Sequence, residues 1–203
     1  MTGAEDSRPL GNAPAEPSPR STGGARTRPR LVALDVDGTL LTTDHRLTPA
    51  AVEAIARVRR QGVDVVLVTS RPPIAVHPLL TALGMHGPDA AFVGSQGALT
   101  GWYSQGGDLH VLHQHPMAVA SARAAITMAE AAGLAVNWYT GTRWLVRRMD
   151  HRVAREADVV GCRPEVARLE DQTSGPDKLL LIATARDRAI LDDVARAMPV
   201  DLR

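Results

Sequence analysis

Two aspartates that directly follow an apolar run are the residues of this sequence best suited to chemistry. The run Leu31–Leu34 precedes Asp35-Val36-Asp37-Gly38-Thr39, and a short continuous apolar run is typical of a parallel strand that is buried on both faces. Ligands of open α/β sheets bind at the carboxyl ends of such strands. A carboxylate there can attack phosphorus and form an aspartyl-phosphate, and a second can protonate the leaving oxygen and later deprotonate water. Asp35 is therefore the candidate nucleophile and Asp37 the candidate general acid and base. A plain Asp-Gly turn after a strand is the alternative interpretation.

The residues after Asp37 predict a βαβ unit that positions this pair. Thr48-Pro49 supplies a helix N-cap and a first-turn proline, apolar residues then recur at helical spacing, and Gly62 stands where a helix ends. Val63–Val68 is a second apolar run, and a helix between two strands requires the strands to be parallel. The second strand leads into Thr69-Ser70-Arg71-Pro72. Both polar clusters should therefore lie at the same edge of the sheet.

The remaining pattern divides into two parts. The first continues with a helix, a short strand and a hairpin, over 74–83, 90–93, and 99–102 with 109–112; the short strand ends in Gly94-Ser95-Gln96-Gly97. From about Met117 the pattern changes to an Ala-rich helix that ends near Gly133. Two strands (135–139 and 144–147), a polar middle, a strand (179–183) and a helix from about Ile190 to Met198 follow, and this order suggests a second, α+β unit.

Composition excludes several classes of partner. The 23 basic and 22 acidic residues nearly balance, so no overall charge recruits nucleic acid or an anionic membrane. No apolar stretch approaches the ~20 residues that span a bilayer, and the single cysteine, Cys162, is compatible with a reducing cytoplasm. We expect a cytoplasmic protein of undetermined oligomeric state. Residues 1–29 are poor in large apolar side chains and are predicted to form a disordered tail.

The motifs resemble those of the haloacid dehalogenase-like superfamily, in particular its Cof-type or IIB phosphatases. The resemblance rests on Leu34–Leu40, on Val66–Pro72, and on Gln96-Gly97-Ala98 in the place of the family's Asn-Gly-Ala. The interval between Asp35 and Thr69 has room for one helix but not for a helical cap domain. The resemblance thus implies an α/β fold in which a Rossmann-like core with a parallel sheet, residues 30–116, carries an inserted α+β cap of the C2 type, residues 117–203.

By the same resemblance, the protein is expected to be a Mg²⁺-dependent phosphatase of small phosphorylated metabolites. Asp35 would attack the phosphoryl group, and its carboxylate together with the Asp37 backbone carbonyl would coordinate Mg²⁺, which prefers oxygen ligands. Thr69 would hydrogen-bond a phosphoryl oxygen. Arg71 would either add positive charge to the site or anchor its loop.

Other positions depart from the family pattern. Ser70, within the candidate phosphate-binding loop, replaces a glycine, and Gln96, which with Gly97 is a candidate loop contact, replaces an asparagine. The resemblance also implies a lysine followed by glycine and a helix, and a Gly-Asp-x-x-Asn-Asp motif whose aspartates complete the metal site. Lys178, the single lysine, instead precedes an apolar strand, and the second motif does not occur.

The chain stops at 201–203, about where the cap should return to the core. We therefore expect a C-terminally truncated chain with weak Mg²⁺ affinity and poor activity. Two alternatives stay open: an inactive remnant or binding protein, and a phosphotransferase that uses the same aspartate.

Two further groups of residues have a structural interpretation beside a functional one. Three histidines lie close together in the sequence: His110, His113 and His115. Histidines can bind zinc, but no Cys or carboxylate is spaced to complete a zinc site. We therefore expect these histidines to be exposed side chains near the domain junction. Three aromatic residues of the second unit either contact the leaving group or form the core of that unit, the second being usual for aromatics in strands; they are Trp138, Tyr139 and Trp144.

Overall fold

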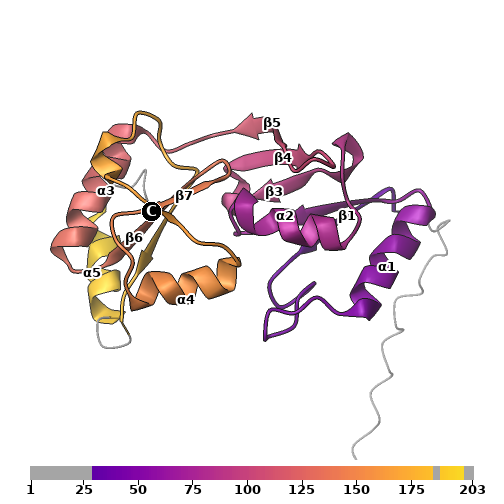
Figure 1. The fold of residues 1–203 in the computed structure, drawn as a ribbon, viewed down its shortest axis with the longest axis horizontal. Coiled ribbons are helices and arrows are strands. Elements are labelled where there is room, and N and C mark those ends of the chain that lie inside the picture. The colour runs from indigo at the N-terminus through magenta and orange to yellow at the C-terminus, as the bar shows by residue number, and fades with distance from the viewer. Residues whose placement is uncertain (1–28, 185–187, 199–203) are drawn as a thin grey trace, which may run out of the picture.

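The computed structural model describes residues 29–184 and 188–198, which form two units built on one sheet each (Figure 1). The tail predicted for residues 1–29 lies outside the described residues apart from Pro29, and so does the chain end at 201–203. The fold class predicted from the sequence, a parallel Rossmann-like sheet followed by an α+β unit, is confirmed. The assignment of these units to domains over 30–116 and 117–203 stays a prediction.

The first sheet has a parallel half and an antiparallel half. Its strands lie in the order of the chain, with β1, β2 and β3 parallel and β4 and β5 antiparallel to their neighbours. The strands are β1 (Leu31–Asp35), β2 (Asp64–Val68), β3 (Phe92–Gly94), β4 (Leu99–Tyr103) and β5 (Leu109–Gln114). The βαβ unit and the hairpin are as predicted. The third strand begins later than predicted because Pro88–Ala90 forms a 3₁₀ turn, η1, ahead of it.

Helices α1 (Pro49–Arg60) and α2 (Pro73–Ala82) connect the parallel strands and contribute to one apolar core. The predicted cap of α1 is present, because the Thr48 hydroxyl accepts a hydrogen bond of 3.2 Å from the Ala51 amide. Alternate strand residues face away from this core, and Leu31 and Val68 are 54% and 38% exposed. Within the described residues β1 has one half-buried face, with Val32 and Leu34, and one exposed face, with Leu31 and Ala33. The apolar run had predicted burial on both faces, but no described element covers the second one.

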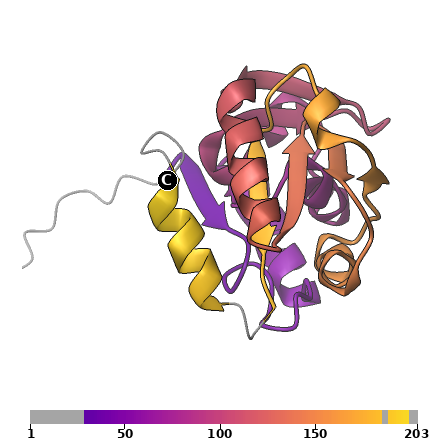
Figure 2. The ribbon, with the colours of Figure 1, turned by 90° about the vertical axis from the view of Figure 1, so that its left-hand side faces the viewer.

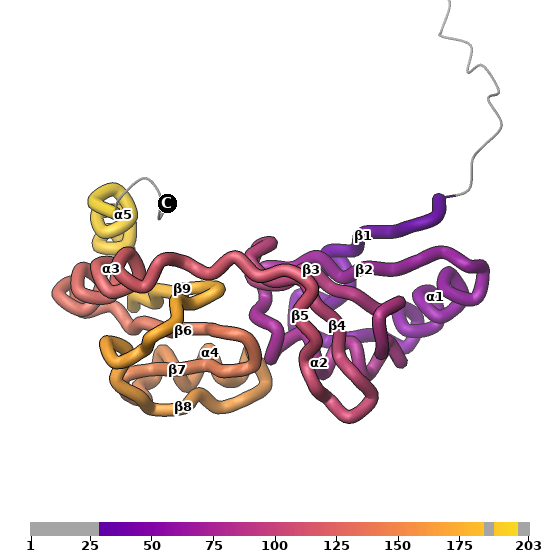
Figure 3. The backbone as a smooth tube through the Cα atoms, turned by 90° about the horizontal axis from the view of Figure 1, so that it is seen from above, coloured from indigo at the N-terminus to yellow at the C-terminus, as the bar shows by residue number. Residues whose placement is uncertain are grey.

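The second sheet has the strand order β8-β7-β6-β9 (Figure 3). Strand β6 is antiparallel to both β7 and β9, and β7 is parallel to β8. These strands are β6 (Ala135–Thr140), β7 (Arg143–Val146), β8 (Glu165–Val166) and β9 (Lys178–Ile182). The accompanying helices are α3 (Val119–Ala131), α4 (His151–Val160) and α5 (Arg188–Ala197), with a 3₁₀ turn, η3, at Leu169–Asp171.

Alternation along β6 builds one core on each face of this sheet. Val136 and Trp138 pack with residues of α3 and α5, which lie on the same side (Figure 2), and Tyr139 packs with Trp144 and α4 on the other. The three aromatic side chains Trp138, Tyr139 and Trp144 are at most 1% exposed. They form the core of this unit, which is the structural interpretation of the two considered.

Helix α4 occupies the segment that the sequence had suggested to be a polar middle. Its N-cap is Asp150, whose carboxylate accepts from the Arg152 and Val153 amides, and its C-cap is Gly161 in the left-handed conformation. The helix was missed because its buried face is narrow: Val153 and Val160 are its buried residues. Among the described residues, no helix is long and apolar enough to cross a membrane.

The two units touch at the start of α2. Ile74 and Ala75 of that helix pack in the same apolar cluster as Tyr139 and Val160. This contact directly follows the Thr69–Pro72 segment, so the second unit lies against the polar edge of the first.

Candidate active site

Asp35 is the last residue of β1, and the chain turns sharply after it. The Val36 carbonyl accepts hydrogen bonds from the Leu40 and Leu41 amides at 3.0 and 2.9 Å, and Gly38 adopts a left-handed φ of 79° within this turn. The Asp35 carboxylate is exposed, and its Oδ2 accepts a long hydrogen bond of 3.4 Å from the Thr39 hydroxyl. The turn thus leaves a carboxylate accessible at the carboxyl end of the strand.

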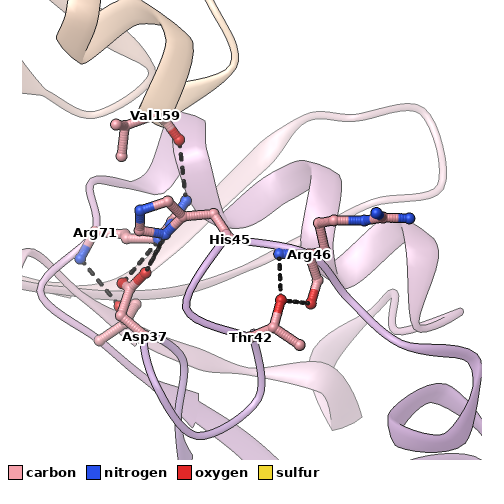
Figure 4. A network of polar contacts seen from close by, with 7 residues as sticks. Asp37, Thr42, His45, Arg46, Arg71 and Val159 are labelled. Atoms are coloured by element: carbon pink, nitrogen blue, oxygen red, sulfur yellow. Dashed lines mark hydrogen bonds and ion pairs between the residues drawn. The ribbon is translucent and has the colours of Figure 1, made fainter.

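The Asp37 carboxylate is held by Arg71 (Figure 4). Arg71 donates two hydrogen bonds to it, of 2.9 Å from Nε and 2.7 Å from a terminal nitrogen, the fork geometry in which a guanidinium binds a carboxylate most strongly. These hydrogen bonds lower the pKa of Asp37 despite its partial burial. The ring Nδ1 of His45 lies 3.3 Å from both the Asp37 carboxylate and the Arg71 guanidinium.

His45 is a site residue that the sequence analysis missed. It lies in a loop closed by Thr42, whose hydroxyl contacts both the Arg46 amide and the Arg46 carbonyl at 3.1 Å (Figure 4). Its φ of 57° is uncommon for a residue other than glycine. A left-handed histidine leaves no signal in a single sequence, so the loop gave no reason to select it.

Thr69 and Arg71 form one compact loop at the end of β2. The Thr69 hydroxyl is buried and accepts a hydrogen bond of 3.1 Å from the Arg71 amide. This contact uses an oxygen lone pair, so the hydroxyl proton remains a donor for a ligand oxygen. Asp35 and Val68 are register partners in the parallel pairing of β1 with β2, and the candidate nucleophile therefore lies beside this loop.

The Gln96 segment joins the Thr69 loop through its backbone. The Gln96 amide donates to the Thr69 carbonyl at 3.2 Å, and the Ser95 amide donates to the Arg71 carbonyl at 2.9 Å. Ser95, Gln96 and Gly97, the turn η2, all have positive φ, a conformation that is strained for the first two. Within the described part of the chain, the buried Ser95 hydroxyl has no hydrogen-bond partner. Ser95 is a second site residue that the sequence did not identify.

The second unit adds two contacts to the same edge. Arg71 donates a hydrogen bond of 3.3 Å to the Val159 carbonyl of α4, and Lys178 of β9 donates one of 2.8 Å to the Ser70 carbonyl. Within the second unit, Glu156 of α4 accepts a hydrogen bond of 3.1 Å from the buried Tyr139 hydroxyl. Burial raises the pKa of Glu156, although this hydrogen bond and the charges of Lys178 and Arg71 oppose the shift.

The oxygen donors at this edge suit Mg²⁺ by chemical type, because hard cations prefer carboxylate and carbonyl oxygens. Over residues 29–184 and 188–198 no group of three or more His, Cys, Asp or Glu side chains could hold a metal ion. The Asp35 carboxylate and the Asp37 carbonyl stay the predicted protein ligands of Mg²⁺. This ligand set leaves the rest of the shell to water and a substrate phosphate, and the weak Mg²⁺ affinity expected from the sequence stays a prediction.

The structure brings most of the predicted site residues together and leaves the histidine cluster apart. Asp35, Asp37 and the loop of Thr69, Ser70 and Arg71 share one edge of the sheet, and Gln96 with Gly97 borders it. The histidines belong to the β5 segment instead, where the His110 ring stacks on Trp102 with centroids 3.8 Å apart.

Comparison with known proteins points to one family. A sequence profile of haloacid dehalogenase-like hydrolases matches residues 32–201. A segment of 59 residues, 29% of this chain, is 46% identical to "Pyridoxal phosphate phosphatase YbhA" of Escherichia coli and covers 22% of that protein.

Solved structures share the fold. One is a haloacid dehalogenase-like hydrolase from Bacteroides thetaiotaomicron, with a TM-score of 0.73, 20% identity, and coverage of 87% of this chain and 65% of that one. Another is a subclass IIB sugar phosphatase, with a TM-score of 0.63, 17% identity, and coverage of 84% and 64%. The chain thus spans less than two thirds of the length of these relatives.

Proposed function

The chain belongs to the haloacid dehalogenase-like hydrolase family, and from this premise we propose that it is a Mg²⁺-dependent phosphatase of small phosphorylated metabolites. The observation that carries the proposal is the position of Asp35, an exposed carboxylate at the end of β1 and beside the Thr69 loop at the end of β2. Of the relatives named above, one is a pyridoxal phosphate phosphatase and one is a sugar phosphatase. We propose the same broad substrate class here.

In the first half of the proposed reaction, the Asp35 carboxylate attacks phosphorus and the bond from phosphorus to the ester oxygen breaks. Asp37 gives its proton to the leaving oxygen. In the second half Asp37 takes a proton from water, the water oxygen attacks phosphorus, and the bond to Asp35 breaks to release inorganic phosphate. The first half leaves Asp37 ionised, which is the form that accepts a proton from water. The second half leaves Asp37 protonated, which is the form that protonates the next leaving oxygen.

The lowered pKa of Asp37 results from its contact with Arg71 and opposes the role of Asp37 as a general acid. While Arg71 holds both carboxylate oxygens, the ionised form of Asp37 is favoured, and this form is the base and not the acid. A phosphoryl group that draws the guanidinium away from Asp37 would relieve that effect. We propose that Arg71 exchanges part of its contact with Asp37 for contact with the substrate phosphate.

The remaining residues of the proposed site bind and orient the substrate. The Thr69 hydroxyl would donate to a phosphoryl oxygen, and the backbone of the Gln96 segment would keep that loop in place. The Asp35 carboxylate and the Asp37 carbonyl would hold Mg²⁺, which neutralises charge on the phosphoryl oxygens when it is bound. The second unit would contact the leaving group and so select the substrate.

Hydrolysis of a generic aryl phosphate by the purified protein tests the proposal. We expect slow, Mg²⁺-dependent release of the aryl alcohol, because few protein ligands hold the metal, and we expect Asp35→Asn to reduce it to background, because the amide lacks the nucleophilic charge. Asp64→Asn is the matched control, since Asp64 starts β2 at the opposite end of the sheet, where it pairs with Leu31. Turnover by Asp35→Asn at the wild-type rate would overturn the assignment.

A further inference from the structure

Lys178 reaches the candidate active site from the second unit, although it lies on a strand. It is the first residue of β9, where it pairs with Tyr139 of β6, and its ammonium group donates to the Ser70 carbonyl at 2.8 Å across 108 positions of sequence. Ser70 stands between Thr69 and Arg71. The contact therefore places a second cation at the loop that we propose binds phosphate.

The backbone that carries Lys178 is fixed at the junction between the units. The preceding residue, Asp177, is 5% exposed, and its carboxylate accepts hydrogen bonds of 2.7 Å from Gln114 at the end of β5 and of 2.6 Å from the Gly141 amide. The Met117 amide donates to the Pro176 carbonyl at 2.9 Å. These contacts from both units hold the start of β9, so the fold determines the position from which the Lys178 side chain extends.

The ammonium group is half-buried and lacks a close carboxylate. Among the described residues, none of the ion pairs within 4.0 Å includes Lys178, and its hydrogen bond goes to a neutral carbonyl. Burial lowers the pKa of Lys178, while Glu156 and Asp37 act from further away to favour its charged form. A partly buried cation that is bound by a neutral oxygen is stabilised by an anion that arrives beside it.

We propose that Lys178 is a phosphate-binding residue of the active site, supplied by the second unit. An ammonium group has three N–H donors, so one can stay on the Ser70 carbonyl while another binds a phosphoryl oxygen. This inference rests on the proposed function and adds a residue to it. It also gives the contact between the units a role in phosphate binding, because the site has both Arg71 and Lys178 only when both units are in place.

The same contact would exist if Lys178 only fastened the second unit to the Ser70 loop, and substitutions separate these roles. Lys178→Gln can still donate to the Ser70 carbonyl but has no charge, whereas Lys178→Arg keeps the charge. Loss of a charged hydrogen bond to phosphate predicts that kcat/KM falls on the order of ten- to a hundredfold in Lys178→Gln. Lys178→Arg should recover much of it.

Arg143→Gln is the matched control for removal of a cation from the second unit, because Arg143 is exposed and pairs with Glu165 of β8. Its kcat/KM should stay at the wild-type value. Wild-type kcat/KM in Lys178→Gln would overturn the proposal, as would an equal loss in Lys178→Gln and Lys178→Arg.

Because the chain has one lysine, chemical labelling gives a second readout that requires no turnover. In EDTA, the aldehyde of pyridoxal 5′-phosphate condenses with the ε-amine and releases water, and borohydride then adds hydride to the imine carbon to leave a stable secondary amine. Peptide mapping distinguishes Lys178 from the N-terminal amine. We expect inorganic phosphate to slow the labelling by pyridoxal 5′-phosphate at Lys178 and not at the N-terminal amine.

The two readouts keep this inference distinct from the proposed function. Protection of Lys178 by phosphate in a protein without phosphatase activity would support the phosphate site and contradict the proposed reaction. Activity that depends on Asp35, combined with labelling of Lys178 that phosphate does not slow, would overturn the role of Lys178 and leave the phosphatase assignment standing.

Discussion

Asp37 and Arg71 lie 34 positions apart in the sequence and meet in a two-point ion pair, with hydrogen bonds of 2.7 and 2.9 Å. The same guanidinium donates to the Val159 carbonyl of α4, and its side chain is 11% exposed. Arg71, from the loop after β2, therefore binds the candidate general acid and base and the second unit at once. One planar group with five N–H donors can serve both.

Arg71→Lys should damage the site even though it preserves the charge. An ammonium group cannot reproduce the fork that binds both Asp37 oxygens while it also reaches the second unit and a phosphoryl oxygen. We expect kcat/KM to fall on the order of ten- to a hundredfold, as measured by aryl phosphate hydrolysis. Arg57→Lys, an exposed position of α1, is the control. Wild-type kcat/KM in Arg71→Lys would show that charge alone matters at this position.

Asp37→Asn should separate proton transfer from metal binding. The substitution removes the carboxylate that transfers the proton but keeps the backbone carbonyl that we propose binds Mg²⁺. We therefore expect kcat to fall about a hundred- to ten-thousand-fold, with no change in the Mg²⁺ concentration that gives half-maximal activity. Initial rates over a Mg²⁺ series measure both quantities, and EDTA should abolish the activity of both proteins. An increase in the half-maximal Mg²⁺ concentration would mean that the Asp37 side chain itself binds the metal.

The elements that carry the first half of the site were predictable because each has a strong local signal. The strand over 63–68 and the Thr48 cap depend on nearest neighbours in sequence, and the structure has both where the pattern predicts them. Helix α4 was missed because half of its residues are charged or histidine and only Val153 and Val160 are buried.

Contacts between distant segments were beyond single-sequence reasoning. The sequence predicts that Lys178 directly precedes a strand, and in the structure it is the first residue of β9, but a strand assignment does not say which loop that side chain will reach. That depends on how the second unit packs on α2, through Ile74 and Ala75. For the same reason Glu156 and His45 carried no signal, since their partners come from other segments.

Asn137 should be essential to the stability of the second unit. Its side chain is fully buried in β6, where it accepts a hydrogen bond of 3.1 Å from the Trp144 indole and donates one of 3.1 Å to the Leu180 carbonyl. Asn137→Ala removes the hydrogen-bond partner of the Trp144 indole and of the Leu180 carbonyl, which costs about 1–3 kcal/mol for each group left unsatisfied. Chemical denaturation measures the loss of unfolding free energy. In a Trp144→Phe background the cost of Asn137→Ala should be smaller, because the indole donor is already absent.

Glu156→Gln should stabilise the protein above the pKa of Glu156 and have little effect in acid. Burial raises the pKa of this carboxyl in the folded state, so the folded protein binds its proton more tightly than the unfolded chain. The resulting destabilisation is absent below the unfolded pKa of about 4.3, grows as the pH rises towards the folded pKa, and is complete above it. The substitution removes that destabilisation, and its amide oxygen can still accept from Tyr139. Thermal unfolding of both proteins from pH 4 to 8 should show curves that separate as the pH rises, with the variant higher. Glu53→Gln, at an exposed position of α1, controls for the loss of one negative charge. A Glu156→Gln curve that falls below the wild type as the pH rises would mean that attraction to Lys178 and Arg71 outweighs burial.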